Sequence, residues 1–303
     1  MKIALHSISY AGYFYDGGHI PLEEMIPKAA KLAYEGIEIM AKRPIASPLD
    51  LDAQAAKAIR KLADSHNMEI AIIAAYADFT KPQPVDREKE FLYVRECMRL
   101  ANDLGCSLVR LYGGGDALHP GIGISFQQQW DLAKEGLKTA AQMAKDYGLL
   151  IALEPHTSVI QTYEDVLDMV EQVGSERIKV CLDPPLLAMR NEPIEKAILA
   201  TGDLLVHSHV MDFVRKPPLV EYHSLPGLAI SECFPIDPVP LGEGIVDLKT
   251  FVRACKQIGY KGSLSFEVCT PFHIHHRRPT IADVDQRVEQ AIEYLRALLH
   301  ANS

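Results

Sequence analysis

The feature that most constrains the fold is an alternation of short apolar segments and longer amphipathic segments, repeated eight times along the chain. The expected strands are Lys2–His6, Gly36–Met40, Glu69–Ala75, Leu108–Tyr112, Leu150–Glu154, Ile178–Asp183, Leu204–His209 and Ser263–Glu267. The expected helices are Leu22–Tyr34, Leu51–His66, Arg87–Leu104, Phe126–Tyr147, Tyr163–Val173, Ile194–Ala200, Leu248–Ile258 and Ala282–Leu299. Eight strand–helix units favour a closed parallel barrel over a doubly wound sheet. No composition break divides the chain, so we predict an α/β fold with a single (β/α)8 TIM-barrel domain over residues 1–303.

Glycines mark several of the expected helix ends. They stand just before the next strand, at Gly36, Gly105, Gly148 and Gly259. Glycine adopts the left-handed conformation that commonly follows the last turn of a helix, so each is expected to end its helix.

One connection is unusually long. About 35 residues separate His209 from Gly244, and they include six prolines. Loops of this length are usually covers or binding loops. Because this loop follows the seventh strand, we expect it to overhang the C-terminal mouth of the barrel.

Composition excludes several classes of protein. The formal charge is 31 − 40 = −9, which disfavours a nucleic-acid partner, and 48% hydrophobic residues allow a large core. We find no run of 18 apolar residues and no apolar leader after Met1, so we predict a soluble, cytoplasmic protein that does not bind membranes. The six cysteines form no CxxC pair and are expected to be reduced.

Four of the later strands end on residues that commonly bind metals. These are Glu154, Asp183, His209 and Glu267. In a barrel the carboxyl ends of the strands meet at one mouth, so the four side chains should converge. A polar residue that merely caps one strand explains any single case, but it does not explain four. Three carboxylates and one imidazole suit Mn²⁺, Mg²⁺ or Co²⁺, and Zn²⁺ less distinctively.

Two further histidines share a strand face with these residues. His156 lies two residues after Glu154 in the stretch LEPHTS, and His207 lies two residues before His209. His156 is either a catalytic base or a hydrogen-bond partner that orients Glu154, and both interpretations stay open. His207 is the more structural of the two, although it is also a candidate for contact with the substrate.

Other substrate-binding candidates come from both halves of the chain. His6, Glu38, Tyr76 and Arg110 close the first four strands and are expected to line the opposite wall of the pocket. His275 and Arg277, in the His- and Arg-rich segment after the eighth strand, are expected to reach the same mouth. The glycines 113–115 lack the phosphate-loop pattern and more simply allow a tight turn.

The strand-end residues and their neighbours resemble the sugar isomerase/epimerase superfamily with a xylose-isomerase-like barrel. The motifs that carry the resemblance are Leu153-Glu154-Pro155, Leu182-Asp183, His209-Val210-Met211-Asp212 and Leu241-Gly242-Glu243-Gly244. The resemblance implies that Glu154, Asp183, His209 and Glu267 hold one divalent metal, with Mn²⁺ the first expectation. It also implies that Glu154 and Glu267 act as acid and base on a ketone-bearing sugar or polyol, through a metal-stabilised enediolate.

The chain departs from the ketose 3-epimerases of that superfamily at two substrate positions. Ile160 stands where they have a glutamate and Leu186 where they have a histidine, whereas Arg215 matches their arginine. These departures make a free-ketose 3-epimerase doubtful.

Several functions therefore remain open. An isomerase or epimerase leads, and the alternatives are a lyase that cleaves 3-oxo-glycosides, like the catalytic subunit of C-glycoside deglycosidases, and an inosose-type dehydratase. An endonuclease IV-like phosphodiesterase is less consistent with the negative charge, and a non-catalytic barrel is less consistent with a complete ligand set. A homo-oligomer is possible, and the lyase interpretation would add a small β-rich partner subunit.

Overall fold

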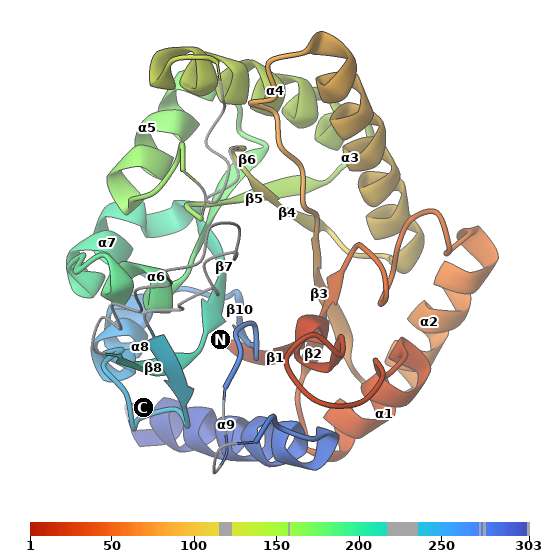
Figure 1. Cartoon of the computed structure of the whole chain (residues 1–303), viewed down its shortest axis with the longest axis vertical. Coiled ribbons are helices and arrows are strands. Elements are labelled where there is room, and N and C mark those ends of the chain that lie inside the picture. Colours follow the sequence, from red (N-terminus) through yellow and green to blue (C-terminus); the bar gives the residue numbers. More distant parts are fainter. Residues whose placement is uncertain (115–122, 157, 217–235, 273, 275–276, 302–303) are drawn as a thin grey trace, which may run out of the picture.

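The strands form a closed parallel barrel, with helices packed around its outside. A computed structural model describes residues 1–114, 123–156, 158–216, 236–272, 274 and 277–301. The barrel closes in the order β1-β10-β7-β6-β5-β4-β3-β2. Figure 1 shows these strands at the centre, ringed by the helices. The predicted TIM-barrel fold is confirmed.

The barrel strands lie within one residue of the expected bounds at either end. They are β1 (Lys2–His6), β2 (Gly36–Met40), β3 (Glu69–Ala74), β4 (Leu108–Tyr112), β5 (Leu150–Glu154), β6 (Ile178–Leu182), β7 (Leu205–Val210) and β10 (Ser263–Phe266). The helices are α1 (Leu22–Lys31), α2 (Ala53–Ser65), α3 (Pro84–Leu104), α4 (Phe126–Asp146), α5 (Tyr163–Val173), α6 (Pro184–Met189), α7 (Ile194–Thr201), α8 (Leu248–Gln257) and α9 (Ile281–Ala301). Two short 3₁₀ segments are η1 (Ser7–Tyr10) and η2 (Gly202–Leu204). No helix in the described ranges is both long enough and apolar enough to cross a membrane.

Besides the two 3₁₀ segments, a short helix and two short strands were not expected from the sequence. The helix α6 begins directly after Asp183, with prolines in its first turn, where a missing N–H costs nothing. The strands β8 (Asp212–Arg215) and β9 (Ile236–Val239) pair antiparallel outside the barrel. Residues 217–235, most of the predicted proline-rich loop, lie outside the described residues, so the predicted overhang stays a prediction.

The prediction that a glycine in the left-handed conformation follows the helix is confirmed at three of the four helix ends. Gly105, Gly148 and Gly259 have φ of 67°, 69° and 68°. The prediction was wrong at Gly36, because α1 ends earlier and Ala33 takes the left-handed conformation, with φ of 65°. Gly36 instead begins β2, where a Cβ would lie 2.9 Å from Cγ of Glu69. This glycine allows a close approach between two strands.

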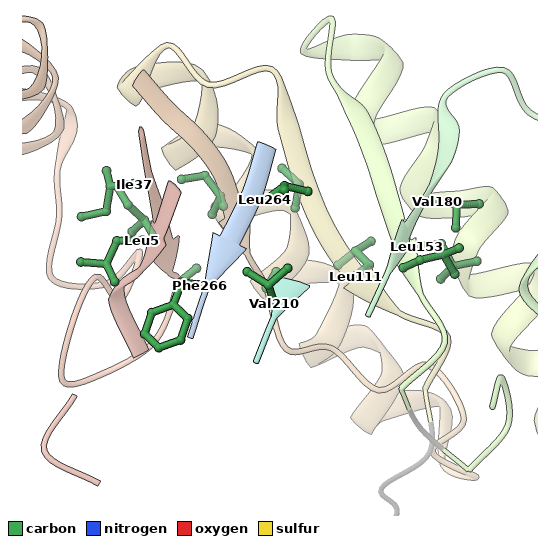
Figure 2. Packing of buried hydrophobic residues seen from close by; sticks show 14 of the residues in the cluster. Leu5, Ile37, Leu111, Leu153, Val180, Val210, Leu264 and Phe266 are labelled. Atoms are coloured by element: carbon green, nitrogen blue, oxygen red, sulfur yellow. The ribbon is translucent and has the colours of Figure 1, made fainter. Parts of the chain in front are cut away.

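The large apolar side chains pack on the outside of the barrel, between its strands and helices. Figure 2 shows Leu5, Ile37, Leu111, Leu153, Val180, Val210, Leu264 and Phe266 in this buried cluster. A separate small cluster consists of Ile72, Ala152 and Cys181. The strand positions that alternate with the outer cluster include the buried polar residues Glu38, Arg110 and His207. The inner face of this barrel is therefore unusually polar, and its polar groups must be paired.

Gly136 offers a test of the packing between helix α4 and the segment after β3. An added Cβ would lie 2.4 Å from Cγ of Phe79, a fully buried ring that stacks on Phe91. We expect Gly136→Ala to reduce the free energy of unfolding by about 1–3 kcal/mol, because overpacking outweighs the helix propensity of roughly 1 kcal/mol that alanine gains. Urea denaturation measures the change. Gly18→Ala, whose Cβ meets nothing within 4 Å, is the control and should change stability little; an unchanged or increased stability of Gly136→Ala would contradict the packing account.

Candidate active site

The four predicted metal ligands come together at the carboxyl ends of four neighbouring strands. Glu154 ends β5, Asp183 follows β6, His209 lies in β7 and Glu267 follows β10. Ligand atoms of Asp183, His209 and Glu267 lie within 4.8 Å of one another. Nδ1 of His209 lies 3.1 Å from Oε1 of Glu154. All four residues are buried, with at most 7% of the surface of any of them exposed.

These residues form the floor of a cavity of about 470 Å³. Its polar part also contains His6, Tyr76, Arg110 and His156. Its other part is apolar and includes Leu186 and Met189 of α6, Met211, and Ile236 of β9. The cavity thus joins a charged floor to an apolar wall, which is typical of sites for small organic ligands.

A larger cavity, of about 600 Å³, lies at the opposite end of the barrel. It includes Lys2 and Arg60, which pair with Glu69 and Asp64, so these charges are largely neutralised within the protein. Sites in TIM-barrel enzymes lie at the carboxyl ends of the strands. We therefore assign the candidate active site to the smaller cavity.

The electrostatics of the four ligands are unbalanced. Burial opposes the ionisation of Glu154, but His209 and Arg110 outweigh it and lower the pKa of Glu154 to about 2. Burial, and then the charge of Glu267, raise the pKa of Asp183 well above its usual value. Burial likewise raises the pKa of Glu267. The carboxylates on this side of the site therefore lack sufficient positive charge nearby.

A divalent cation fits this imbalance. Oδ1 of Asp183 and Oε2 of Glu154 are buried without a hydrogen-bond partner among the described residues. Unpaired buried carboxylate oxygens are costly, and a cation bound between them would remove the cost. Oxygen-rich sites with one imidazole bind hard or borderline divalent ions. Cys181 lies beside Glu154 and His209, but burial raises the pKa of its thiol well above 9, so it is a poor ligand.

Arg110 lines the cavity and lies against two aromatic rings. Its guanidinium carbon is 4.1 Å from the ring centre of Tyr112 and 4.7 Å from that of Tyr76. Its Nε is 3.3 Å from Oε2 of Glu154. Tyr112 was not selected from the sequence, although it lies two residues after Arg110 in β4 and so has the same orientation.

The other sequence candidates lie at different depths and distances. His6 and Tyr76 line the cavity, as does His156, whose ring centre is 4.6 Å from that of Tyr112. Burial lowers the pKa of His156, which keeps its imidazole neutral at pH 7. Glu38 and His207 are not among the described residues that line this cavity; they lie deeper in the barrel.

The remaining arginine candidates are engaged elsewhere. Arg215, on β8, donates to the carbonyl oxygens of Ala188 and Met189 and therefore anchors the end of α6. Arg277 forms an ion pair with Asp283 in the first turn of α9. Neither is among the described residues that line the cavity. His275 lies outside the described residues.

Besides Tyr112, two functional features were missed because they depend on unexpected elements or on contacts. Leu186 and Met189 reach the cavity from α6, which the sequence pattern did not reveal. Cys269 places its Sγ 3.1 Å from Oε1 of Glu267. The position of Cys269, two residues after Glu267, was the only signal for it in the sequence.

Fold and site together define a parallel-barrel enzyme with a carboxylate-rich centre. The model of the xylose isomerase-like TIM barrel family matches residues 26–298, so the chain belongs to that family. It is an enzyme of the isomerase and epimerase kind.

The relatives bear mostly epimerase names. Fructoselysine 3-epimerase from Escherichia coli O157:H7 is 27% identical over 292 residues, which cover 93% of this chain and 96% of that protein. Inosose dehydratase from Geobacillus thermodenitrificans is 20% identical and covers 92% and 90%. Among solved structures, D-psicose 3-epimerase with D-tagatose from Clostridium cellulolyticum H10 has a TM-score of 0.74 at 20% identity, over 99% of both chains. At that identity the structural likeness shows the fold alone.

Proposed function

We propose that the protein is a divalent-metal-dependent epimerase or isomerase of a ketone-bearing sugar or polyol. The observation that carries the proposal is the convergence of three buried carboxyl groups and His209 on the floor of one cavity. The epimerase names of several relatives support the same class of reaction. The substrate is a small carbohydrate, and no nucleic acid is required.

Glu154, Asp183, His209 and Glu267 would hold the metal. Their donor set suits Mn²⁺, Mg²⁺ or Co²⁺, with Mn²⁺ the first expectation, and it suits Zn²⁺ less distinctively. When bound, such an ion polarises a substrate carbonyl and stabilises the negative charge that develops on it.

The two glutamates are the proposed acid and base. One carboxylate removes the proton from the carbon next to the ketone, which leaves an enediolate. Return of a proton to the opposite face of that carbon inverts it, and return to the neighbouring carbon moves the carbonyl. Glu154 is held ionised by His209 and Arg110, whereas the raised pKa of Glu267 favours its protonated form in the metal-free protein.

His156 is a third proton-transfer candidate. It lies at the cavity wall and is accessible to solvent, and its lowered pKa leaves a neutral ring that can accept a proton at pH 7. Its ring packs against that of Tyr112. Its alternative role is to orient Glu154 without exchanging protons.

A substituted sugar is the second candidate substrate, and the apolar wall favours it. Leu186, Met189 and Ile236 offer no hydrogen-bonding side chains to hydroxyl groups at that end of the cavity. A lyase that cleaves 3-oxo-glycosides would begin with the same proton removal and then expel a group from the neighbouring carbon. An inosose-type dehydratase would expel water instead.

Solvent exchange tests the shared first step. Incubation in D₂O with Mn²⁺ and a panel of free ketoses, N-substituted ketoses and 3-oxo-glycosides should introduce deuterium at the carbon next to the ketone, as mass spectrometry would measure. We expect His156→Asn to retain its metal and to slow this exchange about a hundredfold, because a positioned proton acceptor typically contributes 10²–10⁴-fold. An unchanged rate would restrict His156 to orienting Glu154. Absence of deuterium from every member of the panel would contradict the proposed function.

A further inference from the structure

Glu38 lies at the centre of a group of three histidines inside the barrel. Its Oε2 is 2.9 Å from Nε2 of His207, and its Oε1 is 3.1 Å from Nε2 of His209. Nε2 of His6 lies 3.5 Å from the same Oε1. Glu38 has no exposed surface, and it lies beneath the candidate metal ligands rather than among them.

The hydrogen bonds of this group follow from its geometry. Each carboxylate oxygen of Glu38 lies within hydrogen-bond distance of the Nε2 atom of a histidine, His207 on one side and His209 on the other. An ionised carboxylate only accepts hydrogen bonds, so the Nε2 atoms of His207 and His209 must both donate to it. The ring of His209 is thereby fixed with Nε2 toward Glu38 and Nδ1 toward Glu154.

We propose that Glu38 is a positioning residue that presents Nδ1 of His209 to the metal, and that His207 in turn fixes Glu38. This inference rests on the proposed metal site. Histidine ligands of metals usually donate their second ring N–H to a carboxylate, which sets the tautomer and the ring orientation. A line of contacts then runs along the inside of the barrel, from His207 through Glu38 and His209 to Glu154.

The same atoms raise the question of a second metal. His6, Glu38 and His209 place ligand atoms within 4.8 Å of one another. Neither oxygen of Glu38 is left unpaired, however, whereas Oδ1 of Asp183 has no hydrogen-bond partner in the described part of the chain. The need for a cation therefore lies on the Nδ1 side of His209 and not on the Nε2 side, and one metal per chain follows.

Metal binding in the absence of substrate tests the proposal. We expect Glu38→Gln, which keeps the side-chain shape and removes the charge, to weaken Co²⁺ or Mn²⁺ binding about 10–100-fold, as calorimetry would measure. The visible spectrum of the Co²⁺ protein should change, because the histidine ligand is no longer held. Wild-type protein should bind one metal per chain.

Ser265→Ala is the matched control. Ser265 lies beside His209 on the neighbouring strand, in the same layer of the barrel. Its buried hydroxyl has no partner in the described residues, so its removal should leave the metal affinity and the Co²⁺ spectrum unchanged. Thermal unfolding of the metal-free variants separates a positioning effect from a general loss of structure.

The outcomes are distinct. An unchanged affinity and spectrum in Glu38→Gln, or two metals in wild-type protein with one lost in the variant, would overturn the proposal. If Glu38→Gln does not fold, His207→Asn releases the other oxygen of Glu38 and should weaken metal binding at least severalfold; an unchanged affinity would overturn the proposal equally. Metal binding with these properties but without solvent exchange on any sugar would contradict only the proposed function.

Discussion

Replacement of Asp183 by Asn is expected to abolish the stabilisation that the protein gains from divalent metal and to reduce turnover at least about a thousandfold. Asp183 contributes a buried oxygen that has no other partner among the described residues. A metal at a hundred times its dissociation constant stabilises a folded protein by about 2.7 kcal/mol, and this gain disappears when a ligand is lost. Charge stabilisation by a metal is worth several kcal/mol, and each increment of about 1.4 kcal/mol is tenfold in rate.

In the absence of metal, replacement of Asp183 by Asn should not destabilise the protein. Burial and Glu267 disfavour the ionised form of Asp183, so a neutral amide in its place should not lower the melting temperature without metal. Thermal unfolding with and without Mn²⁺ measures both effects. Glu289→Gln, at an exposed position on α9, is the control and should retain the full metal response. A full metal response in Asp183→Asn would exclude Asp183 from the ligand set.

Replacement of Arg110 by Met is expected to reduce the free energy of unfolding of the metal-free protein by about 3–5 kcal/mol, the usual cost of removing one partner of a buried ion pair. Arg110 is 1% exposed and approaches Glu154, which is also 1% exposed. Without the guanidinium, Glu154 retains only His209 as a direct cationic partner. The contacts with the rings of Tyr76 and Tyr112 are lost as well.

A double variant separates the charge from the packing. Arg110→Met combined with Glu154→Gln removes both charges, and it should recover part of the stability lost in the single variant. Urea denaturation of the three metal-free variants and the wild type provides the comparison. If the loss of stability in the double variant equals or exceeds the sum of the two single losses, Arg110 acts mainly through packing rather than by holding Glu154 ionised.

The barrel could be predicted from the sequence because its strands are short, apolar and separated by regular helices. Once the fold was known, the carboxyl ends of parallel strands brought Glu154, Asp183, His209 and Glu267 together without further information. The predicted family is confirmed by the match over residues 26–298. The sequence could not reveal α6, because it is short and begins with two prolines. It could not reveal the pairing of β8 with β9, because these short strands fall within a long connection.

Depth within the barrel separates Glu38 from the sequence candidates that line the cavity. Glu38 was grouped with His6 at the strand ends, but β2 continues for two more residues, to Met40. Arg110 is equally far from the end of β4, yet its longer side chain still lines the cavity. Two residues of strand correspond to roughly 6.6 Å, which is enough to move a side chain from the floor of a cavity to the layer beneath it. The orientation of a side chain follows from strand periodicity, but its depth depends on its distance from the strand end and on its length.

The spacing of family motifs was also insufficient to predict the contacts of the surface arginines. Arg215 matches the family position, but its strand lies outside the barrel and its guanidinium bonds to the end of α6. Its contact with substrate stays a prediction. The same applies to Arg277, whose charge is satisfied by Asp283 in the described structure.

Crystallographic location of the metal tests the central claim most directly. Crystals soaked in Mn²⁺ should show one strong anomalous peak per chain, bounded by carboxylate oxygens of Glu154, Asp183 and Glu267 and by Nδ1 of His209. A peak among His6, Glu38 and Nε2 of His209 would contradict the account of this site. The absence of any peak from crystals soaked in a large excess of Mn²⁺ would contradict it equally.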